Sequence, residues 1–183
     1  MRNNQPVTDN EFNFPDNETL MSATDTRGVI TYVNQSFARV CKFLPSEMVG
    51  QPHNLIRHPD VPPEAYKDLW SNLEQGRFWT GILKNRCKDG DFYWVRANVT
   101  PIYSEGKLSG YVSVRVKPSP EEIEATKRMY ADYRRGHPSQ VFYKGQLVRR
   151  GWRGRIDKAK RLSMRAQLWS IFAAITLLWF GAL

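Results

Sequence analysis

The sequence predicts an α+β domain in which five antiparallel strands form one sheet and short helices cover one of its faces. Strand-like runs occur twice near the start of the chain, at 19–25 and 29–34, and three times later, at 78–87, 92–102 and 108–117. Segments with helical spacing fill the interval between these two groups. Short glycine-containing turns join neighbouring strands, which favours antiparallel pairing.

The first half of the chain supplies a hairpin and the helices. Thr26-Arg27-Gly28 joins the first two strands, and short helices are predicted at 35–43 and 45–51, the second ending near Gly50. Residues 53–63, HNLIRHPDVPP, form an irregular stretch. Asp60 or the prolines after it begin a helix at 63–76, whose apolar residues recur at helical spacing: Ala65, Tyr66, Leu69, Trp70 and Leu73.

A second hairpin, NRCKDGDFYWVRANV at 85–99, contains one residue that does not fit its surroundings. Its loop is Lys88-Asp89-Gly90, and an odd loop length puts the odd-numbered residues of both strands on one face. That face is apolar except for Asn85, whereas the opposite face carries Lys84, Arg86, Lys88, Arg96 and Asn98. A buried amide costs free energy unless it is hydrogen-bonded. Either the protein or a ligand must therefore supply partners for Asn85.

The remaining segments flank this domain. Residues 1–18 are polar and predicted to form a flexible N-terminal cap, with Phe12 and Phe14 as docking points; the folded domain spans 19–117. Residues 118–165 comprise an amphipathic helix, which begins at Ser119 and Pro120, and a basic segment. Residues 166–183 form an apolar end.

Charge and hydropathy together predict a membrane contact at this end of the chain. The net charge is +9, and residues 144–183 contain nine Lys or Arg and only Asp157 as an acid, a balance of +8. The segment AQLWSIFAAITLLWFGAL, 166–183, has no charged residue and Trp169 and Trp179 near its ends, as expected for a transmembrane helix of minimal length. Positive charge before it predicts an inner-membrane protein whose folded domain is cytoplasmic. An apolar helix that docks on a partner protein is the alternative; no motif for nucleic acid is present.

Composition excludes several classes of protein. Cys41 and Cys87 are the only cysteines, too few for a disulfide framework or a metal quartet, and the polar start is no secretory signal. The sequence shows no nucleophile–base pair, no paired carboxylates and no phosphate-binding loop. A sensor is therefore expected rather than an enzyme.

The order of these elements, with YVNQSF, Glu47, Gly50-Gln51 and KDG before an aromatic strand, resembles a PAS domain; Lys42 departs from the glycine common there. GQPHNLIRHPDVP, FWTGILKNRCKDGDFYWVRANVTP, GYVSVRV and YKGQLVRRGW closely resemble the sensor domain of bacterial aerotaxis receptors. This resemblance implies a PAS fold, non-covalent FAD as redox sensor, a homodimer and signalling to a chemotaxis kinase. Those receptors continue into a HAMP module and a kinase-control coiled coil, which these 183 residues do not include.

The flavin-binding light sensors among PAS domains also carry an asparagine five residues before the hairpin glycine, where it contacts the polar edge of the flavin. Asn85 stands in that position relative to Gly90, but the second such asparagine is Val95 here. Their reactive cysteine corresponds to about His53-Asn54, and neither residue is cysteine. The resemblance therefore implies redox chemistry without a light-driven thiol adduct.

Nine residues are candidate FAD contacts, each with a structural alternative. Asn85 matches the alternating donors and acceptors of the flavin edge, or it satisfies strand backbone. Trp79 and Trp70 stack on the ring system or belong to the core. Arg57 pairs with the diphosphate, aided by His58 and Asp60, or these three lie in a surface loop. Asn34 caps a helix or reaches the cofactor, and Tyr93 and Tyr111 line the pocket or pack.

Three other functions stay open at this stage. A haem sensor would use His53 or His58 as an axial ligand, a cofactor-free PAS module would have Asn85 bonded to protein, and a flavoenzyme would turn over NADH.

Overall fold

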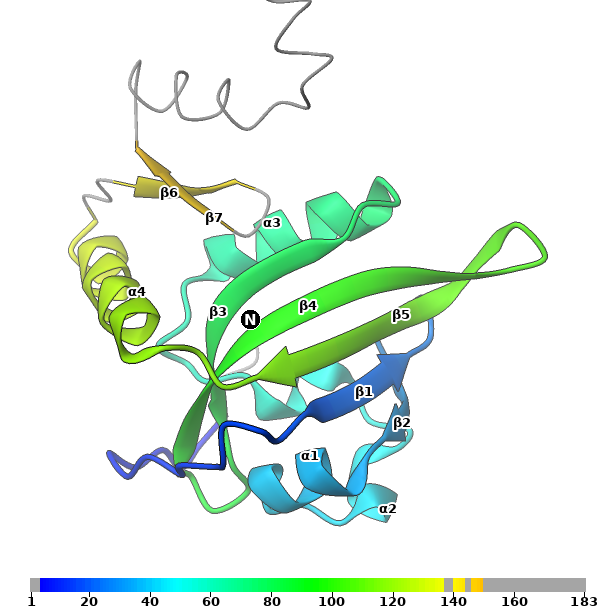
Figure 1. Ribbon diagram of the computed structural model, residues 1–183, viewed down its shortest axis with the longest axis horizontal. Helices are drawn as coiled ribbons and strands as arrows, with labels where there is room; N and C mark the ends of the chain where they lie inside the picture. The colour runs from blue at the N-terminus through cyan, green and yellow to red at the C-terminus, as the bar shows by residue number, and fades with distance from the viewer. Residues whose placement is uncertain (1–3, 137–139, 144–145, 150–183) are drawn as a thin grey trace, which may run out of the picture.

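The computed structural model describes residues 4–136, 140–143 and 146–149, and in these residues the predicted five-stranded sheet is present. The strand order is β2-β1-β5-β4-β3, and each neighbouring pair is antiparallel (Figure 1). The strands are β1 (Leu20–Thr24), β2 (Ile30–Val33), β3 (Trp79–Arg86), β4 (Phe92–Ser104) and β5 (Lys107–Val116).

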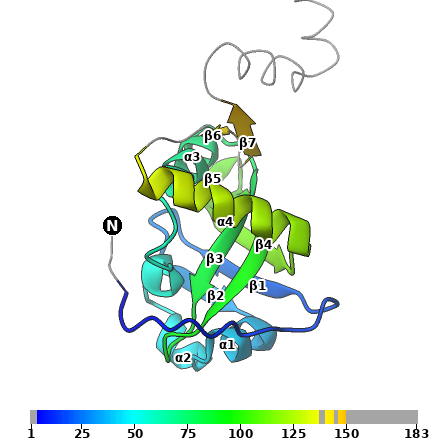
Figure 2. The same ribbon diagram turned by 90° about the vertical axis from the view of Figure 1, so that its left-hand side faces the viewer.

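The helices lie on both sides of this sheet. The inner face is covered by α1 (Gln35–Cys41), α2 (Pro45–Met48), the 3-10 helix η1 (His53–Ile56) and α3 (Pro63–Glu74), whereas α4 (Pro120–Arg134) crosses the outer face over β3 and β4 (Figures 1 and 2). On that outer face the Trp94 and Tyr130 rings are 5.8 Å apart, and the Tyr130 hydroxyl donates to the Ile82 carbonyl at 3.4 Å.

Local sequence explains where the helices begin and end. The Asn34 side chain accepts a hydrogen bond from the Phe37 backbone N–H at 3.0 Å and caps α1. Pro63 occupies the first turn of α3, where its missing N–H is harmless. In α4, Ser119 and Glu122 form a reciprocal capping box.

The register of β3 and β4 confirms the alternation that the sequence predicts. Asn85 pairs with Tyr93, and Gly90 closes the turn with a positive φ of 106°. Asn85 therefore faces the inner side of the sheet with Leu83, Ala97 and Val99, while Lys84 and Arg96 face outward. Buried apolar residues of both layers fill the space beside them, including Phe37, Ile56, Val61, Leu73, Trp79 and Val95.

The N-terminal segment contacts the β3–β4 hairpin through its backbone. The Thr8 N–H donates to the Gly90 carbonyl at 2.9 Å, and the Arg86 side chain donates to the Pro6 carbonyl at 2.7 Å. Asn4 is buried, and its amide donates to the Asn54 and Arg57 carbonyls at 2.8 Å each. This segment therefore holds the loop that contains Arg57.

Two strands lie within the segment that the sequence analysis assigns to a basic linker. β6 (Gln140–Tyr143) and β7 (Gln146–Arg149) pair with each other and lie beside α3 (Figure 1). The Phe142 ring is 5.6 Å from the Tyr133 ring of α4. The apolar segment 166–183 lies outside the described residues; within them, no helix is both long and apolar enough to cross a membrane.

Candidate functional site: a pocket beneath α3

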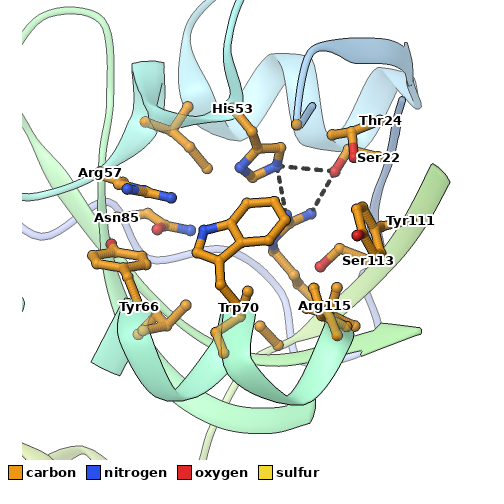
Figure 3. Close-up of a pocket in the computed structure, with 17 residues that line it drawn as sticks. Ser22, Thr24, His53, Arg57, Tyr66, Trp70, Asn85, Tyr111, Ser113 and Arg115 are labelled. Carbon is orange, nitrogen blue, oxygen red and sulfur yellow. Dashed lines mark hydrogen bonds between the residues drawn. The ribbon is translucent and has the colours of Figure 1, made fainter. Parts of the chain in front are cut away.

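A pocket of about 610 Å³, its open mouth included, separates the inner face of the sheet from α3 and η1 (Figure 3). Figure 3 shows Arg57, Tyr66 and Asn85 on one side and Tyr111, Ser113 and Arg115 on the other. Six elements and the loops beside them contribute its lining: Ser22, Thr24, Gly28, His53, Ile56, Arg57, Tyr66, Leu69, Trp70, Leu73, Leu83, Asn85, Ala97, Val99, Tyr111, Ser113 and Arg115.

The two broad walls of the pocket are apolar. Leu69 and Leu73 project from α3 towards Ala97 and Val99 of the sheet. At one end the Trp70 ring meets the Tyr111 ring edge-on, with centroids 5.5 Å apart. Gly28 adjoins this ring in a turn with φ of 79°, and a Cβ there would lie 3.2 Å from Trp70 Cη2. The slot between these walls is suited to a flat, largely apolar ligand.

Asn85 is the polar residue in the apolar part of the pocket. Its side chain is 3% exposed, and its Nδ2 has no hydrogen-bond partner in the structure. The backbones of Asn85 and Arg57 form an isolated antiparallel bridge, which places both residues at the same edge of the pocket. A buried donor without a partner costs free energy, so this amide is poised for a ligand.

Arg115 is buried beside His53 and Ser22. Its guanidinium donates to His53 Nε2 at 2.8 Å and to Ser22 Oγ at 3.1 Å, and it lies 4.6 Å from the centroid of the Phe37 ring. Burial lowers its pKa, and within the described chain no carboxylate pairs with it. Because Nε2 accepts this bond, His53 is neutral, and burial together with the Arg115 charge holds the His53 pKa well below 6.5.

A second guanidinium lies near Asn85. Arg57 lies over the Tyr66 ring, 4.0 Å from its centroid, and burial lowers the Arg57 pKa. The Tyr66 hydroxyl and the Ser113 hydroxyl are buried without hydrogen-bond partners. Since none of the described residues that line the pocket is acidic, its charged groups are both positive and its free polar groups include several donors. An anionic or acceptor-rich ligand fits this arrangement.

Four of the nine predicted residues line the pocket: Asn85, Arg57, Trp70 and Tyr111. Trp79 and Tyr93 share the inner face but are packed into the core beyond it. The Trp79 Nε1 donates to Asp68 at 2.8 Å, and its ring covers Gly81 so closely that a Cβ there would be 2.4 Å away. The Tyr93 hydroxyl is 3.0 Å from Cys41 Sγ.

The other three predicted residues also lie outside the pocket lining. Asn34 caps α1, as described above. His58 is buried, and its Nδ1 accepts a hydrogen bond from the Asp60 backbone N–H at 3.1 Å. The Asp60 carboxylate contacts Lys84 and Arg134 on the outer side of the sheet. Neither Cys41 nor Cys87 lines the pocket, and burial raises both thiol pKa values, that of Cys87 to about 12.

Two polar residues of the lining, Arg115 and Ser113, were not predicted from the sequence, and His53 was named only as a possible haem ligand. Arg115 and Ser113 share the odd-numbered face of β5 with Tyr111, so the alternation applied to β3 and β4 also identifies them. His53 lies in η1, in a stretch without periodicity, and its position requires the structure.

Comparison with known proteins defines the class of this domain. Residues 30–115 match the family model described as PAS fold. Over 178 residues the chain is 42% identical to the aerotaxis receptor of Escherichia coli K12, a match that covers 96% of this chain and 35% of the receptor. Over 96 residues it is 32% identical to the nitrogen fixation regulatory protein of Klebsiella pneumoniae, covering 52% of this chain and 19% of that protein.

Solved structures share the same fold. A PAS domain of a protein from Colwellia psychrerythraea superposes with a TM-score of 0.50 at 25% identity, covering 55% of this chain and 86% of that one. A light-oxygen-voltage domain described together with a flavin analogue gives a TM-score of 0.53 at 24% identity, covering 63% and 87%. The second likeness concerns the fold alone.

Residues 30–115 of this chain therefore form a domain with the PAS fold. The 42% identity also confirms its resemblance to aerotaxis receptors, although the chain spans only about a third of that relative's length.

Proposed function

We propose that this chain is the sensory part of an aerotaxis-type redox sensor, which binds FAD in the pocket beneath α3. One observation carries the proposal: an apolar slot whose buried amide donor, on Asn85, has no partner among the described residues and whose charged lining residues are both arginines. Similarity to the aerotaxis receptor supports a flavin-type cofactor.

Several residues of the pocket carry groups that would suit the ring system and the charged tail of FAD. The Asn85 amide offers two donors and one acceptor to the edge of the ring system, where donors and acceptors alternate. Trp70 and Tyr111 offer aromatic surface. Arg57, at the same edge as Asn85, is the residue that we assign to the negatively charged tail. Bound there, FAD would supply electron transfer.

Two residues give the pocket its sensitivity to charge. Arg115 keeps a positive charge in a low-dielectric site, which favours whichever form of a ligand is the more negative. His53 holds that guanidinium through Nε2 and stays neutral while it does so. The Asn85 amide exchanges donor for acceptor by rotating, so this residue responds to a change of protonation in its partner.

A haem sensor and a cofactor-free PAS module both fit the pocket less well than a flavin-binding sensor. His53 faces the pocket, but its Nε2 accepts a hydrogen bond from Arg115, and coordination of a haem iron through that atom would take one of its two hydrogen-bond acceptors from the buried guanidinium. His58 is outside the lining. A cofactor-free module would need a protein acceptor for the Asn85 amide, and the described residues provide none.

We extend the proposal to the cellular setting. Residues 166–183 would anchor the chain in the inner membrane, with the PAS domain on the cytoplasmic side and the basic segment next to the lipid headgroups. The chain would act as a homodimer and as a sensor rather than an enzyme, passing its signal through α4 to a chemotaxis signalling partner.

The absorption spectrum of the purified full chain in detergent tests the proposal. We expect a yellow protein that bleaches with dithionite and releases FAD, identified by chromatography, on heating. Protein that stays colourless after incubation with excess FAD and FMN would overturn it; FMN alone in the supernatant would correct the cofactor.

A further inference from the structure

Asp60 lies outside the pocket, at the point where three elements meet. Its Oδ2 accepts a hydrogen bond from Lys84 Nζ of β3 at 2.8 Å, and its Oδ1 is 3.4 Å from the Arg134 guanidinium of α4. Burial alone would raise the Asp60 pKa, but the Lys84 hydrogen bond and the nearby positive charges lower it overall, so the carboxylate is ionised at neutral pH.

On one side, Asp60 and its partner Lys84 lie close along the chain to Arg57 and Asn85, which meet at the edge of the pocket. It follows Arg57 by three residues in the same loop, and Lys84 directly precedes Asn85 on β3. The Lys84 side chain is only 12% exposed and also lies 4.0 Å from the centroid of the Phe92 ring, so it is held firmly. A displacement of Arg57 or Asn85 would therefore move one partner of the Asp60–Lys84 pair.

On the other side, Asp60 reaches the last residue of α4. Elsewhere along the helix, contacts with the sheet include the Trp94–Tyr130 ring contact, the hydrogen bond from Tyr130 to Ile82 and an ion pair between Arg96 and Glu122 near the helix start. Arg134 ends the helix, and β6 follows it in the chain. The Asp60–Arg134 pair thus links the pocket loop to the end of α4 from which the chain continues towards its basic segment.

We propose that Asp60 is a positioning residue that ties the Arg57 loop and β3 to the C-terminal end of α4, and that it is not a ligand of the cofactor. When the pocket loop shifts, the carboxylate transmits the shift to Arg134 and changes how firmly the last turn of α4 is docked. The contacts are independent of any ligand, whereas the redox dependence of the docking rests on the proposed function.

The test is amide hydrogen exchange, followed by mass spectrometry, on the full chain in detergent in the oxidised and dithionite-reduced states. Asp60→Asn removes both ion pairs, Arg134→Gln removes only the pair with α4, and Lys84→Gln removes only the pair with β3. Arg135→Gln is the matched control, because Arg135 pairs with Asp132 at 2.6 Å within the same helix and does not contact Asp60.

Because Arg134 is 58% exposed, we expect a modest effect, with exchange in residues 128–134 about two- to fivefold faster in Asp60→Asn and Arg134→Gln. Arg135→Gln should match the wild type. The decisive measurement is the difference in exchange rate between the oxidised and the reduced protein. If Asp60 were only structural, its substitution would leave this difference unchanged. This difference should shrink in both variants and be restored by Asp60→Glu, with flavin occupancy at the wild-type level throughout.

Loss of flavin in Asp60→Asn with no change of exchange in Arg134→Gln would make Asp60 a cofactor ligand and overturn the proposal. Equal effects of Arg134→Gln and Arg135→Gln would also overturn it. If Asp60→Asn does not fold, Arg134→Gln and Lys84→Gln carry the same test. A wild-type chain without flavin would refute the proposed function, while the exchange comparison would still decide whether Asp60 docks α4.

Discussion

The two faces of the sheet differ in how their polar groups are satisfied, and adjacent residues of β3 show the contrast. On the outer face Lys84 donates to Asp60, and Arg96 pairs with Glu122. On the inner face, one residue further along, the buried Asn85 Nδ2 has no partner among the described residues, and within the same part of the chain Arg115 contacts a histidine and a serine but no carboxylate. The ionic groups of the outer face have partners within the chain, whereas the inner face leaves polar groups that the proposed ligand would satisfy.

This contrast separates the polar residues that stabilise the fold from those that are available to bind a ligand. A buried polar group without a partner lowers stability unless a ligand or water bonds to it. Charged residues on the outer face should therefore affect the docking of α4, and polar residues on the inner face should affect ligand affinity. The four predictions below test this division, beginning with the largest expected effect.

The two tryptophans beside the inner face should behave differently. Trp79→Ala removes a fully buried ring and leaves Asp68 without its indole donor, so it should lower the free energy of unfolding by about 3–5 kcal/mol. Trp70→Ala, in the half-buried pocket wall, should cost less stability and instead weaken FAD binding. Urea titration and flavin content of both variants are the measurements. Equal stability losses would remove the distinction between core and pocket.

Stability should fall as the pH drops from about 7 to 5. Burial, with the Arg115 charge, holds the His53 pKa well below 6.5, and burial, with the Lys84 charge, lowers the His58 pKa to about 4. At a pH between the folded and unfolded pKa values, only the unfolded chain binds the proton. The free energy of unfolding therefore falls by about 1.4 kcal/mol per histidine for each unit by which the pH drops in this range. The carboxylates with lowered pKa values, such as Asp60, contribute only at lower pH.

Urea titrations at pH 5, 6 and 7 measure this slope, and His58→Asn should flatten it while retaining an acceptor for the Asp60 N–H. An unchanged slope in that variant would show that His58 charges freely in the folded protein, and the inner region would then be less secluded than its contacts indicate.

Asn85→Ala should separate binding from folding. Loss of the amide should weaken FAD binding by about 5- to 100-fold, equivalent to 1–3 kcal/mol of lost hydrogen bonding. The unfolding free energy of the ligand-free protein should change by less than about 1 kcal/mol, because the variant also removes a buried donor that lacks a partner. Asn98→Ala on the outer face, where Asn98 accepts from Thr80 at 3.0 Å, is the matched control and should leave FAD affinity intact. If Asn98→Ala weakened FAD binding and Asn85→Ala did not, the outer face rather than the inner face would bind the cofactor.

Much of this division was predictable from the sequence, because alternation along a strand is a local property. The three-residue loop Lys88-Asp89-Gly90 put the odd-numbered residues of both strands on one face. This alternation placed Asn85 inward and Lys84 and Arg96 outward, as the structure confirms. Arg115 obeys the same parity.

What could not be predicted depends on irregular backbone and on distances between elements. Odd or even position along a strand tells which face a side chain is on, but not whether it borders the pocket or lies in the core. Trp79 and Asn85 share a face, yet of the two only Asn85 lines the pocket. The loop 57–60 has no period, and nothing local indicates that Arg57 points into the pocket while Asp60 reaches Arg134. Such placements follow from how α3 and α4 dock, which is a tertiary property.

The smallest predicted effect concerns the beginning of α4. The Ser119 hydroxyl accepts from the Glu122 N–H at 3.3 Å, and the Glu122 carboxylate accepts from the Ser119 N–H at 2.8 Å and pairs with Arg96. Ser119→Ala removes one half of this capping box and should lower stability by about 1 kcal/mol, with faster amide exchange confined to the first turn of α4. Ser119→Asp, which restores a capping acceptor, is the control. FAD affinity should match the wild type in both, since the cap lies on the outer face; a weaker affinity in Ser119→Ala alone would mean that the two faces are coupled through the start of α4 as well as through Asp60.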